Sequence, residues 1–190
     1  LNSSNGGKHS YNVKAGYLMA NYDPAGPWAV EASARLDDYS NFGTELNPAI
    51  NIIYNISRKI NLHALLSRCF RAPTFNELYW PPTNWAQGNP NLKPEEGMSG
   101  EFGLDGQIND KFLWGLTYFR NDFDNLIDWA ADGAIWRPSN LNSVLSEGIE
   151  GEAKAYLGKS FEVDLNYTYT RAKDDKTNKY RADWPKYKFS

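Results

Sequence analysis

Five aromatic side chains lie in two long polar segments of the chain and are the best candidates for contacting a ligand: Tyr79, Trp80, Trp85, Trp129 and Trp136. Exposed rings bind ligands by stacking and by apolar contact, and aromatic residues are enriched at binding surfaces. The same rings could instead pack the two segments against each other. The sequence leaves both interpretations open, and we treat the five residues as candidate ligand contacts.

No group of residues has the spacing of a catalytic site. Ser99 lies in Gly97-Met98-Ser99-Gly100, which lacks the Gly-x-Ser-x-Gly spacing of a nucleophile elbow. His9 and His63 fall in different predicted strands, and neither belongs to a recognisable motif. Because hydrolysis needs a nucleophile, a base and an orienting group together, we expect that the chain is not an enzyme and has no catalytic residue or cofactor.

Three carboxylates begin a spacing that is typical of a calcium loop, namely Asp122, Asp124 and Asp128. Such a loop needs glycine at its sixth position and glutamate at its twelfth, where this chain has Ile127 and Gly133. We therefore predict a solvated loop and no metal site. Calcium held by oxygen atoms from several loops stays an open alternative.

The overall composition excludes two classes of protein. The 190 residues carry a net charge of −3, so nucleic acid is not an expected partner. Mean hydropathy is −0.64, and no stretch approaches the roughly 18 consecutive apolar residues of a membrane-spanning helix. A membrane β-barrel remains compatible, because its strands alternate between apolar and polar residues.

Apolar and polar residues alternate along most of the chain, which is typical of strands with one apolar face. In one segment Trp28, Val30 and Leu36 alternate with polar residues such as Glu31. Each predicted strand has roughly 10–14 residues, and a tilted strand needs about 9–11 to cross a bilayer. The predicted strands are 10–22, 28–40, 45–56, 60–71, 98–107, 111–123, 143–156, 161–172 and a ninth that starts near 182.

The connections between these strands alternate in length. Short turns lie at one end, whereas the long segments 72–97, 124–142 and 173–181, with a shorter one at 41–44, lie at the other. Outer-membrane barrels have this asymmetry, with short periplasmic turns and long extracellular loops. The pattern predicts an all-β, antiparallel, up-and-down transmembrane barrel segment. A β-sandwich with an aromatic core is the alternative.

Arg68 interrupts the apolar face of its predicted strand, after Leu62, Ala64 and Leu66. A cationic side chain facing lipid costs about 2–4 kcal/mol at the bilayer midplane but roughly 0–1 kcal/mol near the interface. Because Arg68 comes late in the strand, we expect it at the interface, and a β-bulge is the other explanation.

An ordered set of motifs carries a family resemblance. The chain has Ser67, Phe70-Arg71-Ala72-Pro73, Glu77-Leu78-Tyr79, Gly88-Asn89-Pro90 and Leu92-Lys93-Pro94-Glu95 in this order. Tyr118-Phe119-Arg120-Asn121, Gly148-Ile149-Glu150-Gly151-Glu152 and Tyr167-Thr168-Tyr169 follow. This set resembles the barrel of TonB-dependent outer-membrane receptors, and the vitamin B12 transporter and siderophore receptor subfamilies are nearest.

The resemblance implies a 22-stranded barrel, which is a size known for plugged outer-membrane transporters. Residues 1–190 would form about eight or nine of these strands. It also implies that the plug domain and the C-terminal strands lie outside this segment. The implied location is the outer membrane of a Gram-negative bacterium, with outer-membrane lipid and, through the plug, TonB as partners.

The function implied by the resemblance is active uptake of a large, scarce solute, such as an iron–siderophore or a corrinoid. TonB would transmit the proton-motive force to the receptor. The alternatives from other classes are a passive, porin-like outer-membrane channel and a secreted β-sandwich that binds carbohydrate.

Overall fold

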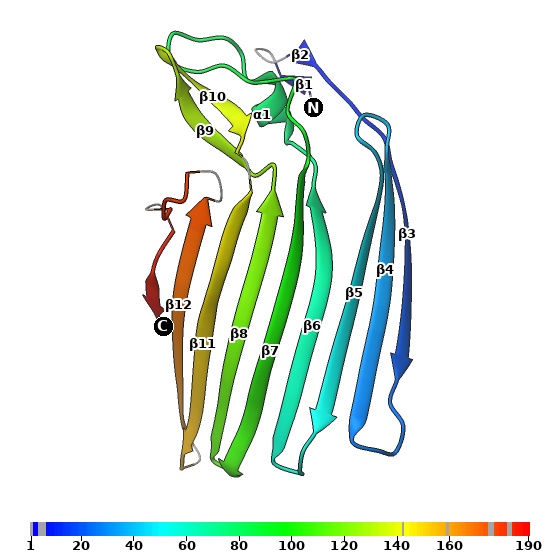
Figure 1. The fold of residues 1–190 in the computed structure, drawn as a ribbon, viewed down its shortest axis with the longest axis vertical. Coiled ribbons are helices and arrows are strands. Elements are labelled where there is room, and N and C mark those ends of the chain that lie inside the picture. The colour runs from blue at the N-terminus through cyan, green and yellow to red at the C-terminus, as the bar shows by residue number, and fades with distance from the viewer. Residues whose placement is uncertain (1, 4–6, 142, 159, 175–176, 182–183) are drawn as a thin grey trace.

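Nine antiparallel strands form one continuous sheet (Figure 1). The computed structural model describes residues 2–3, 7–141, 143–158, 160–174, 177–181 and 184–190. Along the sheet the order is β13-β12-β11-β8-β7-β6-β5-β4-β3. The strands are β3 (Val13–Tyr22), β4 (Trp28–Tyr39), β5 (Gly43–Asn55), β6 (Ile60–Arg71), β7 (Glu95–Asn109), β8 (Phe112–Asp124), β11 (Val144–Leu157), β12 (Phe161–Asp174) and β13 (Tyr187–Phe189).

The remaining elements lie together beyond one end of this sheet (Figure 1). They are β1 (Asn2–Ser3), β2 (Gly7–Lys8), the short helix α1 (Phe75–Tyr79) and the hairpin of β9 (Ile127–Asp132) and β10 (Ile135–Asn140). No helix among the described residues is both long and apolar enough to cross a bilayer.

The predicted strands and the all-β, antiparallel fold class are confirmed. The largest differences in position are at β3, which begins at Val13 and not at residue 10, and at β7, which begins at Glu95 and not at 98. The expected start of a ninth strand near residue 182 lies outside the described residues, and the pairing with β12 is described from Tyr187 onward. Helix α1 and the β9–β10 hairpin were not predicted.

The register gives the sheet one apolar and one polar face, because residues directly opposite each other on antiparallel strands share a face. One row of the apolar face crosses the whole sheet through Tyr22, Val30, Ile52, Ala64, Phe102, Tyr118, Ile149, Tyr169 and Tyr187. A row of the polar face runs through Asn55, Asn61, Asp105, Gly115, Glu152 and Asn166.

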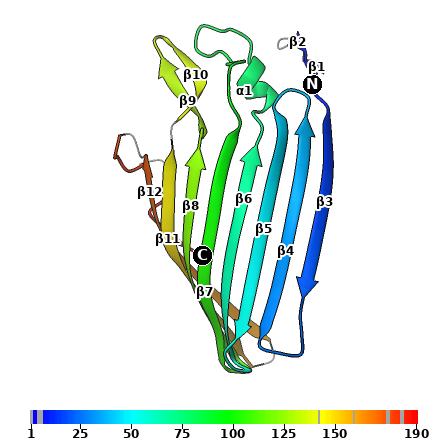
Figure 2. The ribbon, with the colours of Figure 1, turned by 45° about the vertical axis from the view of Figure 1, so that its right-hand side comes forward.

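No second layer of the described chain covers the apolar face. Leu18 is 73% exposed and Leu165 is 62% exposed, and the long strands make most of their contacts with their neighbours in the sheet. The buried apolar residues of the described chain are few: Leu78, Ala86, Leu92, Val144 and Ala172. Figure 2 shows that the sheet is curved and single-layered. A β-sandwich, which needs two packed sheets, is therefore not the fold of this chain.

Arg68 lies where strands β5 and β6 separate. Their pairing ends at Ala49 and Ser67, next to Pro48, which has no N–H to donate to a neighbouring strand. Arg68 bridges the separated strands, since its Nη1 donates to the Leu46 carbonyl at 2.7 Å and its Nη2 to Glu45 Oε2 at 2.9 Å.

Arg68 lies near the end of β6, and its location at the membrane interface stays a prediction. Its Nη2 also donates to Glu96 Oε2 at 2.8 Å, next to the beginning of β7. The pairing of β6 with β7 runs without a shift from Ile60 to Arg71, so a bulge is not the explanation on this side of β6.

Candidate functional site

The candidate ligand contacts lie in two segments beyond the sheet, the described residues of 72–94 and 125–143, which we call the loop cap. Its first segment contains helix α1, which begins after Thr74 with a capping box. The Glu77 N–H donates to Thr74 Oγ1 at 3.2 Å, and the Thr74 N–H donates to Glu77 Oε2 at 2.7 Å. This reciprocal pair satisfies two N–H groups that have no partner within the helix.

Arg71 connects the end of β6 to both α1 and the start of β7. Its Nε donates to Glu95 Oε2 at 2.6 Å, and its Nη1 donates to Glu77 Oε1 and Oε2 at 3.2 Å. Glu95 Oε1 also accepts the Ile127 N–H at 2.7 Å, so the same carboxylate reaches the first residue of β9. Four elements therefore meet at this one ionic cluster.

The ionic cluster also changes the acidity of Glu77. Partial burial opposes ionisation of its carboxyl group, but the hydrogen bonds from Arg71 and Thr74 outweigh this effect and hold the pKa of Glu77 below its usual range. Glu77 is consequently a carboxylate at neutral pH.

Side-chain amides join the two segments of the loop cap. Asn140 accepts the Lys93 N–H at 2.8 Å and donates through Nδ2 to the carbonyls of Lys93 at 2.8 Å and Asn125 at 2.7 Å. Asn89 Nδ2 donates to the Pro138 carbonyl at 3.0 Å. The hydrogen bonds to Lys93 and to Pro138 connect residues almost fifty positions apart and fix the β9–β10 hairpin against the first segment.

Main-chain hydrogen bonds extend this connection toward the outer end of the loop cap. The Trp136 N–H donates to the Trp85 carbonyl at 2.7 Å, and the Gln87 N–H donates to the Trp136 carbonyl at 3.0 Å. Arg137 Nη2 donates to Gln87 Oε1 at 2.9 Å. Two of the candidate tryptophans are therefore held side by side by their backbones.

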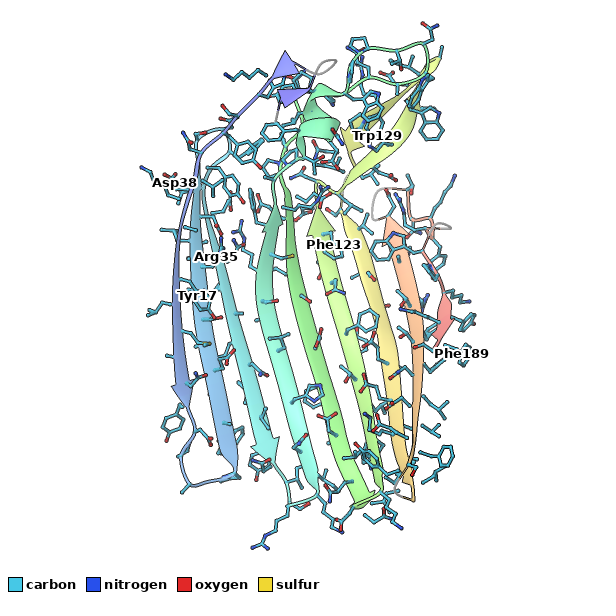
Figure 3. The ribbon with its side chains drawn as sticks, turned by 180° about the vertical axis from the view of Figure 1, so that it is seen from behind. Tyr17, Arg35, Asp38, Phe123, Trp129 and Phe189 are labelled. Atoms are coloured by element: carbon cyan, nitrogen blue, oxygen red, sulfur yellow. The ribbon has the colours of Figure 1, made fainter. Side chains whose placement is uncertain are left out.

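Four of the five candidate rings contact other rings. Trp80 lies edge-on to Trp85 at 5.9 Å and to Trp129 at 6.2 Å between ring centroids. Tyr79 stacks on His9 at 3.5 Å, with an angle of 2° between the ring planes. Figure 3 shows Trp129 within the loop cap, beyond the sheet. These contacts are of the kind that packs loops together.

Trp85 and Trp136 also present much of their surface to solvent. Trp85 is 59% exposed and Trp136 is 53% exposed. Trp80 Nε1 and Arg137 Nε, in contrast, are buried and have no hydrogen-bond acceptor among the described residues. The loop cap thus combines a packed aromatic interior with two tryptophan surfaces that remain accessible. The assignment of all five rings as ligand contacts stays a prediction.

The sequence motifs contain Arg71, Glu77, Asn89 and Glu95, but the contacts by which these residues and Asn140 organise the loop cap were not predicted. Two local signals were present in the sequence. Thr74-x-x-Glu77 is the pattern of a capping box. Gly133-Ala134 is the two-residue turn between β9 and β10, and the glycine at its first position has a φ of +64°. The partners of Asn89 and Asn140 carry no comparable signal.

The three aspartates with partial calcium-loop spacing have separate partners. Asp122 pairs with Arg120, Asp124 accepts from Ser143, and Asp128 pairs with Arg181 at 2.7 Å. No group of three or more potential ligands that could hold a metal ion is found among the described residues.

The residues considered for catalysis also have other partners. Ser99 Oγ donates to Asn121 Oδ1 at 2.5 Å. His63 Nδ1 lies 2.8 Å from Asp105 Oδ2, and its Nε2 lies 3.3 Å from Thr117 Oγ1. His63, Asp105 and Thr117 all lie on the polar face of the sheet and tie strands β6, β7 and β8 together.

Comparisons with known proteins agree with the single curved sheet. The family model "TonB dependent receptor-like, beta-barrel" matches residues 1–190. The vitamin B12 transporter BtuB of Photobacterium profundum is 38% identical over 154 residues, which cover 77% of this chain and 24% of the relative. The ferric enterobactin receptor PirA of Pseudomonas aeruginosa is 28% identical over 193 residues, covering 89% of this chain and 26% of the relative.

Solved structures show the same arrangement of strands. The crystal structure of the siderophore receptor PirA from Pseudomonas aeruginosa superposes with a TM-score of 0.73 at 28% identity, covering 85% of this chain and 32% of that one. The chain spans about a quarter of the length of the curated relatives described above. The relatives are transporters and receptors, and this chain belongs to the β-barrel family of TonB-dependent receptors.

Proposed function

We propose that this chain forms part of the wall and the extracellular loops of an outer-membrane receptor that takes up a large, scarce solute. The family membership supports this proposal, because similar proteins bear the names of a vitamin B12 transporter and of ferric enterobactin receptors. The uncovered apolar face supports a location in the outer membrane, where lipid would cover it.

The loop cap supplies the surface for the first contact with the solute. The observation that carries this assignment is the pair of accessible tryptophans, Trp85 and Trp136, held together by the hydrogen bond between their main chains. Two rings on rigid supports can contact a large ligand without a large loss of conformational freedom. An iron–siderophore or a corrinoid has the size and the apolar surface that such a pair fits.

The energy for uptake would come from the proton-motive force, transmitted by TonB through the plug domain of the full-length receptor. No bond in the solute is broken. The step is a conformational change, which requires that the two states of the receptor bind the ligand differently. The polar face of the sheet, with side chains such as Glu152 and Asn166, would border the plug.

The first test measures binding of vitamin B12 and of ferric enterobactin to cells that carry the full-length receptor. We expect Trp85→Ala combined with Trp136→Ala to weaken binding of the recognised ligand by about tenfold or more, since tryptophans at binding interfaces are frequent hot spots. Trp28→Ala is the matched control, because Trp28 is 50% exposed but lies at the short-turn end. Unchanged binding in the double variant would remove the loop cap from the ligand site.

A second test separates active uptake from passive flow. Collapse of the proton gradient with a protonophore should abolish uptake of the recognised ligand but leave its binding intact. A porin-like channel would continue to pass the solute under the same conditions, so continued uptake would support that alternative.

A further inference from the structure

Basic and aromatic residues gather on the apolar face at the loop end of strands β12 and β13. Arg171 and Lys173 follow Tyr169 on the same face of β12, at alternate positions. Lys186 lies just before β13, and the Thr170 N–H donates to its carbonyl at 3.0 Å. We call Arg171, Lys173, Lys186 and Tyr180 the basic cluster.

Aromatic rings hold the three cations of this cluster in place. The Arg171 guanidinium lies 5.3 Å and Lys173 Nζ lies 6.0 Å from the centroid of the Tyr180 ring, and Arg171 also donates to the Tyr180 hydroxyl. Lys186 Nζ lies 5.3 Å from the Tyr187 ring and 5.8 Å from the Tyr169 ring. Rings attract cations without neutralising them, so the positive charge of the cluster remains available.

Carboxylates neutralise other cations on the same face but not these three. Arg68 pairs with Glu45 and Glu96, and Arg120 pairs with Asp122. Arg171, Lys173 and Lys186 form no ion pair with any carboxylate among the described residues. Glu147, which lies opposite Arg171 in the register, accepts a hydrogen bond from the Tyr118 hydroxyl at 3.1 Å.

The surface directly below the cluster is apolar. Leu165 is 62% exposed, Val163 is 39% exposed and Phe189 is 77% exposed, all on the face that also carries Tyr167. A groove of about 360 Å³ between β12 and the segment leading to β13 is lined by Tyr169, Arg171, Tyr180 and Lys186. A ligand that matches both surfaces is an anionic amphiphile with its negative headgroup in the groove and its alkyl chains along the strands.

We propose that the basic cluster binds the phosphate groups of a lipid in the leaflet on the loop side of the membrane. The proposal rests on the proposed function only in that the apolar face must lie in a bilayer. Tyrosines such as Tyr169 and Tyr187 prefer the boundary between hydrocarbon and headgroups, which places the cations at the level of the phosphates. Arg68 and Arg120, the other arginines of this face, are already paired with carboxylates, whereas Arg171, Lys173 and Lys186 lie together at one edge of the described sheet.

The test uses the full-length receptor, purified in detergent, and measures bound lipid by native mass spectrometry. The probe is bisphosphorylated lipid A, with the same lipid lacking both phosphates as comparison. We expect Arg171→Gln, Lys173→Gln and Lys186→Gln together to weaken lipid A binding roughly 100-fold, because each basic residue near an anionic surface contributes roughly fivefold. Binding of the dephosphorylated lipid should be the same in both proteins.

The matched control replaces three cations at the short-turn end, Arg58→Gln, Lys59→Gln and Lys111→Gln, which should leave lipid A binding unchanged. If the triple variant of the cluster folds poorly, Lys173→Gln with Lys186→Gln keeps the contact between Arg171 and Tyr180 and should still weaken binding roughly 25-fold. Equal binding of lipid A by native and variant receptors would overturn the proposal. Displacement of lipid A by millimolar inorganic phosphate would overturn it as well, because the site would then select a free anion.

Ligand uptake is a separate measurement. The cluster lies on the face opposite to the one that would border the plug, so variants in it should take up ligand at the native rate when they are present at equal amounts. Loss of lipid binding in variants that take up ligand normally would support the lipid site. Normal lipid binding in a receptor that takes up neither probe solute would refute the transport proposal and leave the lipid site intact.

Discussion

The sheet and the loop cap are held together by different kinds of interaction. Long ladders of main-chain hydrogen bonds connect the strands, and the apolar face is not covered by the described chain. In the loop cap, side chains such as Arg71 and Asn140 connect segments that are distant in sequence, and rings such as Trp80 pack on other rings. The sheet therefore depends on its neighbouring strands and on lipid, whereas the loop cap depends on a few specific side chains.

This difference between the sheet and the loop cap indicates which region tolerates substitutions. Almost any apolar residue can face lipid, and the ladder does not depend on side-chain identity, so the wall accepts many substitutions that keep the alternation. The loop cap has no comparable repeating pattern of main-chain hydrogen bonds, so the loss of one side chain removes several contacts. A receptor can thus change its ligand by changing the cap while the wall stays the same.

The largest expected effect is a steric one in the wall. A Cβ atom at Gly148 would lie 2.0 Å from the Tyr169 carbonyl oxygen and 2.6 Å from the Phe119 ring. Gly148→Ala should therefore force β11 away from β12, cost about 3 kcal/mol and sharply reduce the folded receptor in outer membranes. The measurement is the fraction of full-length receptor that resists unfolding in detergent without heating. Gly151→Ala is the control, since nothing lies within 4 Å of a Cβ there.

The next largest effect concerns the ionic cluster of the loop cap. Arg71→Met should leave Glu77 and Glu95 as unpaired carboxylates, although their side chains are only 14% and 13% exposed. We expect a cost of about 2 kcal/mol, less than for a fully buried pair because Arg71 itself is 42% exposed. Limited proteolysis should then cut residues 72–94 faster while the sheet stays folded. A global loss of the barrel would contradict the division between cap and wall.

A smaller effect should appear on acidification. The pKa of Glu77 is lower in the folded cap than in the unfolded chain, so the stabilisation is complete above the ordinary glutamate value of about 4.3. It is lost as the pH falls through the lower pKa of the folded state. Protease sensitivity of residues 72–94 should increase over this range, and Glu77→Gln should be sensitive already at neutral pH. An identical pH profile in the variant would exclude Glu77 as the titrating group.

The smallest effect is expected for an exposed ion pair on the apolar face. Arg120 and Asp122 are 3.0 Å apart, but their side chains are 52% and 50% exposed. Pairs of this kind contribute little to stability, so Arg120→Gln should leave both the folded fraction and the proteolysis pattern unchanged. A clear loss of folded receptor would show that this pair is needed at the membrane boundary.

The wall could be predicted from the sequence because its information is local. Alternation with a period of two marks each strand, and the connections at one end are short, so neighbours in sequence become neighbours in the sheet. The separation of β5 and β6 shows the limit of this reasoning. The pairing of β6 ends next to Pro48, which lies on β5, and Arg68 then bridges the two strands. The local sequence of β6 does not contain this information.

The loop cap could be predicted only in part. Its five candidate aromatic residues lie outside the nine-stranded sheet as expected, but Trp129 and Trp136 belong to the β9–β10 hairpin, which was not predicted. Helix α1 has five residues and too little periodicity to be recognised in the sequence. The hydrogen bonds between Asn140 and Lys93 and between Asn89 and Pro138 join residues that are 47 and 49 positions apart in sequence. Nothing in the identity of an asparagine states which distant main-chain atoms it will meet, so these contacts become visible only in three dimensions.

The order of strands in the sheet has a consequence for the speed and sequence of folding. Each strand of the sheet pairs with the strand that precedes or follows it in the chain, except for the pairing of β8 with β11, which are separated in sequence by the β9–β10 hairpin. Closing a short loop costs little entropy, and chains rich in local pairings fold quickly. The sheet can consequently grow hairpin by hairpin from its short turns, and the slower pairings should be β6–β7 and β8–β11, which are joined by the long connections 72–94 and 125–143.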